Sequence, residues 1–109
     1  MRIEKAALAG TMESNDVMVT LEPGGSGIEI DLSSVVEKQF GDEIRKVIRE
    51  TLLELKVESA RVTAVDKGAL DCTIRARVKA AVFRSVGEAA YPADTRISPP
   101  ASASEGGER

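Results

Sequence analysis

The sequence predicts a single α+β domain, in which a small antiparallel β-meander packs against a long amphipathic helix and is followed by a further strand and a second helix. Two observations predict this class. Short runs rich in β-branched residues, separated by turn formers, fill the first third of the chain. Apolar residues then recur every three to four positions, as in a helix with one buried face. A chain of 109 residues has the length of one domain.

Three strands are expected in the first third of the chain. Residues 4–11 form a weak first strand, residues 17–22 are rich in β-branched side chains, and residues 28–32 alternate apolar and acidic side chains. Between the first two strands, residues 14–16 read Ser-Asn-Asp, a combination that favours a tight turn because these side chains bond to nearby backbone. The sequence therefore predicts a β-meander with Ser14 at the tip of its first hairpin.

The long helix is predicted over residues 35–56. Ser34 and Glu37 have the spacing of a capping box, in which each side chain bonds a free backbone N–H of the other residue. The expected buried stripe consists of Val36, Phe40, Ile44, Val47, Ile48, Leu52 and Leu55. Gly41 interrupts the pattern at a cost of about 1 kcal/mol relative to Ala, which a periodic run of this length absorbs.

The second half of the chain predicts a short strand at residues 61–65 and a helix at 69–85. The second segment also alternates like a strand, but its length and its lack of internal Gly or Pro favour a helix. From residue 87 the composition shifts to Ala, Pro, Ser, Gly and Glu, with too few apolar residues to offset the entropy of ordering. We expect a folded domain over 1–86 and a disordered tail over 87–109.

Composition excludes most catalytic classes. The chain contains no histidine, so Ser-His-Asp and Cys-His arrangements and imidazole metal sites are excluded, and its single cysteine can form neither an internal disulfide nor a structural zinc site. The net charge of −3 offers no attraction to nucleic acid or anionic membranes. No segment approaches the roughly 20 apolar residues of a membrane span, and the N-terminus lacks the apolar run of a signal peptide. We expect a soluble, cytoplasmic protein that is not an enzyme and binds no metal, nucleic acid or membrane.

Four features are candidates for chemistry. Taken alone, Ser14 is most simply a turn former; because no base lies near it in sequence, its chemical alternative is a passive acceptor that another enzyme modifies and not an activated nucleophile. Cys72 is expected as a small buried hydrophobe. Asp66 and Asp71 fit helix capping as well as a carboxylate pair. The basic residues of the last helix, which fit a solvated face better than a phosphate site, are Arg75, Arg77, Lys79 and Arg84.

Three collinear segments carry a resemblance to a known family. They are Gly-Thr-Met-Glu-Ser-Asn-Asp-Val-Met-Val at 10–19, Val-Glu-Lys-Gln-Phe-Gly-Asp-Glu-Ile-Arg at 36–45, and Asp-Lys-Gly-Ala-Leu-Asp-Cys-Thr-Ile-Arg-Ala-Arg at 66–77. Together they resemble the citrate lyase acyl carrier proteins, the gamma subunits, in order from residue 3 to residue 85. The residues alone leave open a second class, a non-covalent regulatory or oligomerisation module.

The resemblance implies a non-catalytic carrier subunit. In that family the serine of the Glu-Ser-x-Asp segment, here Ser14, carries 2'-(5''-phosphoribosyl)-3'-dephospho-CoA through a phosphodiester bond. The resemblance further implies an alpha subunit that exchanges acetyl for citryl, a beta subunit that releases oxaloacetate, a transferase that attaches the group and a ligase that acetylates it. Ser26, Ser33, Ser34 and Ser59 do not match the motif and are interpreted as turn or cap residues. A carrier of citramalate lyase is the alternative within the same class.

Overall fold

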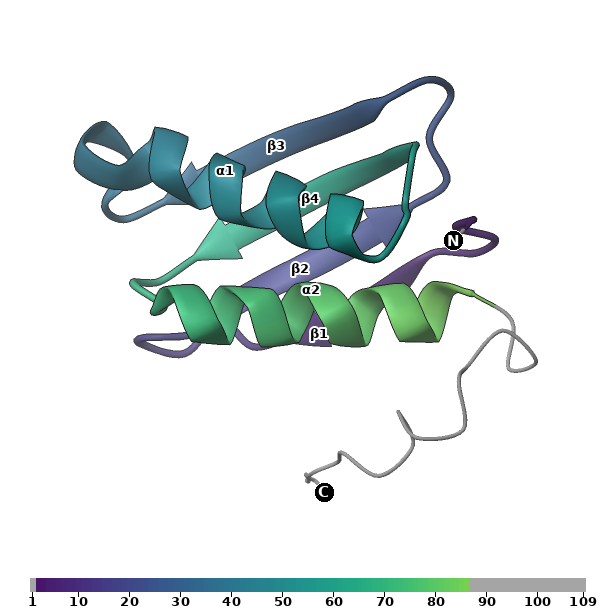
Figure 1. Ribbon diagram of the computed structural model, residues 1–109. Helices are drawn as coiled ribbons and strands as arrows, with labels where there is room; N and C mark the ends of the chain where they lie inside the picture. Colours follow the sequence, from purple (N-terminus) through teal and green to yellow (C-terminus); the bar gives the residue numbers. More distant parts are fainter. Residues whose placement is uncertain (1, 87–109) are drawn as a thin grey trace.

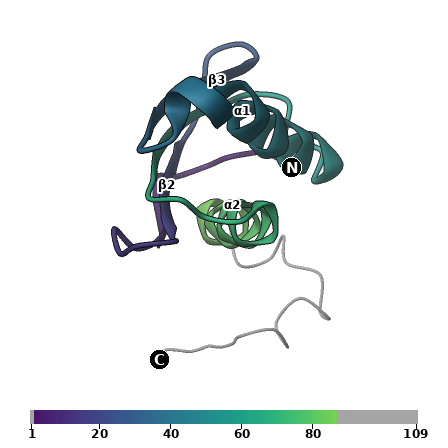
Figure 2. The same cartoon turned by 90° about the vertical axis from the view of Figure 1, so that its left-hand side faces the viewer.

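The computed structural model describes residues 2–86 as two layers, a four-stranded sheet with two helices on one face (Figures 1 and 2). The elements in chain order are β1 (Ala7–Gly10), β2 (Val17–Glu22), β3 (Ile28–Ser34), α1 (Glu37–Glu54), β4 (Ala60–Asp66) and α2 (Asp71–Ser85). The predicted α+β class and the order of its elements are confirmed, including a helix rather than a strand in the last segment. The predicted tail, 87–109, lies outside the described residues.

The strand order, β1-β2-β4-β3, differs from a meander in one respect. β1 pairs with β2 as an antiparallel hairpin, as predicted, but β3 pairs in parallel with β4, which lies between β2 and β3. The crossover through α1 allows this, because parallel neighbours need a long connection rather than a tight turn. β4 suits the central position because Ala60, Val62 and Ala64 are all fully buried, whereas β3 carries exposed acidic residues at the edge. The prediction that β3 follows β2 in the sheet is therefore wrong.

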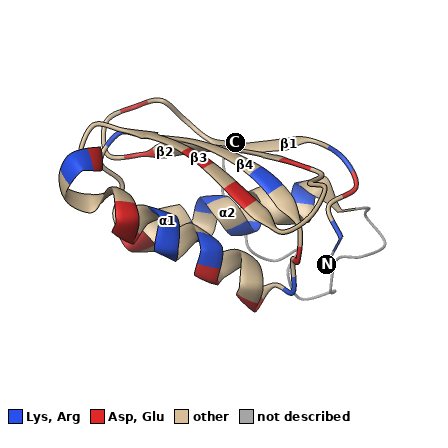
Figure 3. Ribbon diagram, turned by 90° about the horizontal axis from the view of Figure 1, so that it is seen from above, with Lys and Arg blue, Asp and Glu red and all other residues tan. Residues whose placement is uncertain are grey.

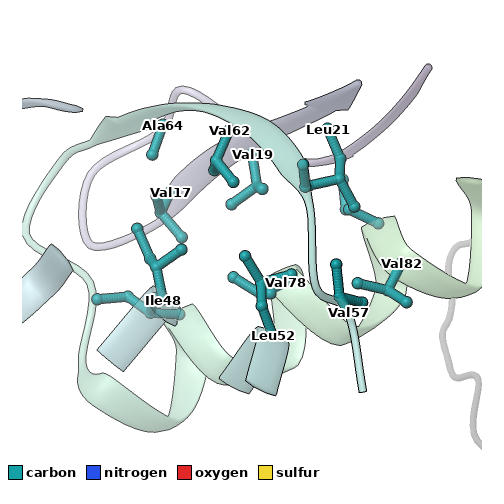
Figure 4. Close-up of a cluster of buried hydrophobic side chains, with 14 of the residues drawn as sticks. Val17, Val19, Leu21, Ile48, Leu52, Val57, Val62, Ala64, Val78 and Val82 are labelled. Atoms are coloured by element: carbon teal, nitrogen blue, oxygen red, sulfur yellow. The ribbon is translucent and has the colours of Figure 1, made fainter. Parts of the chain in front are cut away.

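The core between the sheet and the helices is aliphatic (Figure 4). Its fully buried side chains come from the inner face of β2 and β4 and from the facing sides of both helices: Val17, Val19, Leu21, Val62, Ile48, Leu52, Val78 and Val82. Burying each such side chain contributes roughly 1.5–3 kcal/mol. Neither described helix combines the length and the apolar character that crossing a membrane requires.

The N-terminus of α1 differs from the sequence expectation. The helix begins at Glu37 with Val36 at the N-cap position and no side-chain cap, so the predicted capping box does not form. Ser34 is still part of β3, where its hydroxyl accepts the Val36 N–H at 3.1 Å. Phe40, predicted as part of the buried stripe, is 52% exposed. The first turns of α1 extend beyond the end of α2 (Figures 1 and 3), and Phe40 there lines a surface pocket with Ala69 and Leu70 instead of joining the core.

Candidate functional site

Ser14 lies at the exposed tip of the connection between β1 and β2, where the turn chemistry of the sequence placed it. The Asp16 N–H donates to the Glu13 carbonyl at 3.1 Å, which closes a four-residue turn. Asn15 has a φ of +67°, at the position of the turn where Gly or Asn is favoured. Within the described residues, the Ser14 hydroxyl makes no hydrogen bond. The turn therefore presents this hydroxyl to solvent.

Two backbone hydrogen bonds hold this turn against the connection between β4 and α2. The Asn15 N–H donates to the Lys67 carbonyl at 2.8 Å, and the Lys67 N–H donates to the Asp16 carbonyl at 2.8 Å. They continue the antiparallel pairing of β2 with β4 beyond its last ladder pair. At the start of the connection between β1 and β2, Gly10 has a φ of +99°, and a Cβ at this residue would lie 1.8 Å from the Val17 carbonyl oxygen. Only glycine fits this close approach.

The Asp16 carboxylate has the largest number of contacts in the turn. Its Oδ1 accepts the Val17 N–H at 2.7 Å and Arg77 Nε at 3.0 Å. Its Oδ2 accepts the Thr11 hydroxyl at 2.6 Å and Arg77 Nη2 at 2.7 Å. Burial raises the pKa of Asp16, but the hydrogen bonds from Arg77, Thr11 and the Val17 N–H outweigh it and hold the pKa below its ordinary value.

Sequence reasoning did not find this ion pair. Asp16 was expected as a residue of the turn, and Arg77 as part of a solvated helix face. The two residues are 61 positions apart, and no local pattern links them. Arg75 lies 3.4 Å from Glu50, and Arg84 donates to the Leu8 carbonyl at 2.6 Å. The prediction of a solvated basic face is therefore wrong for Arg77, whereas Lys79 and Arg84 are exposed as predicted.

Asp66 joins three segments beneath the site. Its side chain is buried, and its Oδ2 accepts the Ser34 hydroxyl at 2.8 Å and the Gly68 N–H at 3.1 Å. Its Oδ1 accepts the Ala69 N–H at 2.9 Å. The carboxylate thus stabilises the turn that leads into α2, but α2 has no side-chain cap, so the helix-capping interpretation is wrong for Asp66, and Asp71 lies exposed. The ends of β3 and β4 and the start of α2 all depend on this one side chain.

Cys72 is exposed, so its prediction as a buried core residue is wrong. The buried face of α2 consists of Ile74, Val78, Ala81, Val82 and Ser85. Because the helix begins at Asp71, position 72 falls in its first turn and off that face. The thiol belongs to the surface and not to the packing of the domain.

The charges around the site do not form a catalytic group. Figure 3 shows both signs alternating along α1 and mainly basic residues along α2. Within residues 2–86, no three carboxylate or thiol side chains are grouped closely enough to hold a metal ion. An exposed serine hydroxyl without a bonded base suits modification by another enzyme.

Comparisons with known proteins cover the whole site. The family model for the malonate decarboxylase delta subunit matches residues 4–85. A citrate lyase acyl carrier protein of Streptococcus uberis is 59% identical over 87 residues, which cover 80% of this chain and 86% of the relative. One from Latilactobacillus sakei is 52% identical over 91 residues, covering 84% and 90%. A chain in a Pseudomonas malonate decarboxylase hetero-tetramer shares the fold with a TM-score of 0.57 at 22% identity, covering 79% of this chain and 89% of that one.

Proposed function

Because the chain belongs to the family of citrate lyase acyl carrier proteins, we propose that Ser14 is the residue to which its prosthetic group is attached. The chain is a non-catalytic carrier subunit, and the acyl carrier proteins of citrate lyase carry a prosthetic group. The proposed group is 2'-(5''-phosphoribosyl)-3'-dephospho-CoA, bound to the Ser14 oxygen through a phosphodiester. One observation supports this assignment above the others: the serine of the Glu-Ser-x-Asp segment is exposed at the tip of a braced turn.

The residues of the turn fit a bulky covalent substituent. Ser14 is exposed and its hydroxyl bonds no group among the described residues, so a phosphodiester there displaces no contact. The bonds that brace the turn fall instead on Asn15 and Asp16. Arg77 places its guanidinium next to the turn, where it offsets the negative charge of Asp16 and so favours an anionic linkage. When bound, the group supplies a terminal thiol for acyl transfer.

The carrier role explains why the chain needs no acid or base of its own. Chemistry resides in the group and in the partner enzymes, while this chain supplies a fixed attachment point. A tether raises the effective concentration of its cargo at a partner site to around the millimolar range. We propose alpha and beta subunits as these partners, the first exchanging acetyl for citryl and the second releasing oxaloacetate. A separate transferase attaches the group and a ligase acetylates it.

The choice between citrate and citramalate lyase lies with the partner subunits. Both carriers would present the same serine on the same turn, so the geometry of this chain is equally suited to each. Purifying the chain from its source with the subunits bound to it identifies the substrate through their activity. A non-covalent module, in contrast, would be purified without a mass adduct.

Ser14→Ala tests the attachment site. We expect wild type to gain a covalent adduct from the transferase and precursor, and Ser14→Ala to gain none and to support no lyase turnover. The exposed Ser33 supplies a matched control, so Ser33→Ala should load like wild type. The melting curve should hardly change, because the turn loses less than about 1 kcal/mol with this hydroxyl. Ser14→Thr should load slowly, because its β-branch crowds the attacking oxygen.

Intact mass and peptide mapping decide the result. An adduct on Ser14→Ala, or one that maps to Ser33, would contradict the site assignment. No adduct on wild type, under conditions that load a known carrier, would contradict the proposed function itself.

A further inference from the structure

We propose that Arg77 is a positioning residue for the modification of Ser14, acting through Asp16. This inference rests on the proposed function, because it requires Ser14 to be the attachment point. Arg77 lies on α2, on a segment far from the turn in sequence, and donates to the carboxylate two residues after Ser14. The role of the pair is to fix the direction in which the Ser14 hydroxyl points.

The geometry of the pair fixes orientation as well as distance. Arg77 donates through Nε and Nη2 to the two different oxygens of Asp16, at 3.0 and 2.7 Å. Such a two-bond contact holds the plane of the carboxylate relative to the guanidinium, which a single bond does not. The Asp16 side chain is 13% exposed and that of Arg77 38%, so water screens this pair less than a fully exposed one.

The same carboxylate binds both sides of the turn. Thr11, before Ser14, donates its hydroxyl to Oδ2, and Val17, after Ser14, donates its N–H to Oδ1. The Thr11 hydroxyl in turn accepts the Glu13 N–H at 3.2 Å. Asp16 is therefore the point at which the two arms of the turn meet. Arg77 fixes that point to α2, and the backbone bonds to Lys67 fix it to the end of β4.

This arrangement predicts an effect on reaction rate more than on folding. A transferase must align the serine oxygen with the reacting phosphorus at about 3–3.5 Å, and a displacement of about 1 Å can lower the rate by about 100-fold. Isolated ion pairs near a surface contribute little to stability. Removing Arg77 should therefore leave a folded carrier whose hydroxyl samples more directions.

Kinetics of loading by the transferase test the proposal on full-length chains. Arg77→Gln and Asp16→Asn should each lower kcat for loading by about 10- to 100-fold with little change in KM for the carrier. The double variant should be no slower than Asp16→Asn alone, because Arg77→Gln removes only the contact with Asp16 that Asp16→Asn already disrupts. Arg77→Lys retains the charge but not the two-bond geometry and should restore only part of the rate. Lys79→Gln, which removes an exposed cation from the same helix, is the control and should load like wild type.

Amide hydrogen exchange gives a readout that does not depend on the enzyme. In Arg77→Gln the Asn15 N–H, which bonds Lys67 in the native turn, should exchange faster while the N–H groups of β2 and β4 keep their protection. Equal protection at Asn15, or an unchanged kcat in the folded variant, would overturn the proposal.

Two further outcomes are informative. If the KM for the anionic precursor rises in Arg77→Gln while Asp16→Asn is loaded normally, the positioning role is overturned. Arg77 would then contact the precursor directly. Peptide mapping of loaded wild type separates this inference from its premise. An adduct on Ser14 with unaffected Arg77 variants refutes the inference alone, whereas an adduct elsewhere refutes the proposed attachment site.

Discussion

Substitution of Asp66 tests which bonds stabilise the end of the domain that carries the Ser14 turn. Its carboxylate is 1% exposed and accepts three hydrogen bonds, from the Ser34 hydroxyl and from the N–H groups of Gly68 and Ala69. In Asp66→Ala all three donors lose their acceptor. We expect this substitution to destabilise the fold more than any other replacement of a charged residue in the described chain.

The magnitude follows from the number and kind of bonds. A hydrogen bond to a charged group contributes about 1.5–3 kcal/mol, so three would give at most about 9 kcal/mol. Two effects reduce this loss of stability. In the wild type the buried carboxylate has already lost its hydration, which offsets part of the gain from its hydrogen bonds. In Asp66→Ala, water reaches the partly buried donors and bonds to them in place of the carboxylate. We expect a net loss of about 3 kcal/mol, a large part of the 5–15 kcal/mol by which domains are stable.

Asp66→Asn separates the bonds from the volume of the side chain. Its single oxygen can accept from Ala69, and its NH2 can donate to the Ser34 hydroxyl, which is able to act as acceptor. The Gly68 N–H then faces a donor and is left unsatisfied. We expect a loss of about 1–2 kcal/mol, near the cost of one unsatisfied buried group. Asp71→Ala, which removes an exposed carboxylate from the start of the same helix, should change stability by about 0.5 kcal/mol or less.

Urea unfolding followed by circular dichroism measures these differences, with the denaturant dependence checked for a constant m value. Native-state hydrogen exchange should show faster exchange at Gly68 in both Asp66 variants, and at Ala69 in Asp66→Ala alone. A loss below about 1 kcal/mol for Asp66→Ala would refute the reasoning, because the three bonds would then contribute nothing net. A larger effect of Asp66→Asn than of Asp66→Ala would refute it as well.

Two further predictions concern exposed or titrating groups. Because the folded pKa of Asp16 lies below its ordinary value of 3.8, its contribution to stability should be complete above about pH 5 and disappear as the pH falls through 3.8 to the folded value. The difference in urea midpoint between wild type and Asp16→Asn should shrink over that range, and a pH-independent difference would contradict the ion-pair assignment. Cys72→Ala should change stability by about 0.5 kcal/mol or less, because the side chain is exposed. The native thiol should react with a thiol reagent at the rate of the unfolded chain, and protection from it would show that the residue is buried.

Local periodicity was sufficient to predict the elements of this fold. The spacing of Ile44, Val47, Ile48 and Leu52 identified α1, and their burial confirms it. The position of β4 between β2 and β3 was not predictable in the same way, because strand pairing depends on residues far apart in the chain. Both edge and central strands alternate with a period of two, so alternation alone does not reveal neighbours. The structure supplies this information: the inner face of β4, with Val62 between two alanines, is fully buried, as expected of a central strand.

The candidate site likewise has one part that local sequence predicted and one part that it did not. The Ser-Asn-Asp turn was predictable because its cause lies within three residues, and Asn15 adopts the positive φ that such turns require. The pairing of Asp16 with Arg77 depends on α2 lying beside β1 and β2, which no local pattern contains. Cys72 was misplaced because the apolar alternation around it also fits a strand, and a helix that begins at Asp71 turns the thiol outwards.

The contacts of the turn fit the proposed attachment of a large group at Ser14 without disturbance of the core. Val17 is fully buried and lies three residues after Ser14, so the core begins immediately beyond the turn. Asp16, which lies between them, binds the Val17 N–H and Arg77 through its side chain and Lys67 through its backbone. These bonds hold Asp16 in place, so that movement at Ser14 is not passed on to the core. The effective concentration of a tethered cargo depends on the length and stiffness of the tether and falls when its geometry cannot reach the partner site. A braced turn keeps the origin of that tether constant, so that its reach is set by the proposed group alone. Loosening the turn at Arg77 should therefore slow the delivery of cargo as well as the loading of Ser14, even where each partner still binds the carrier.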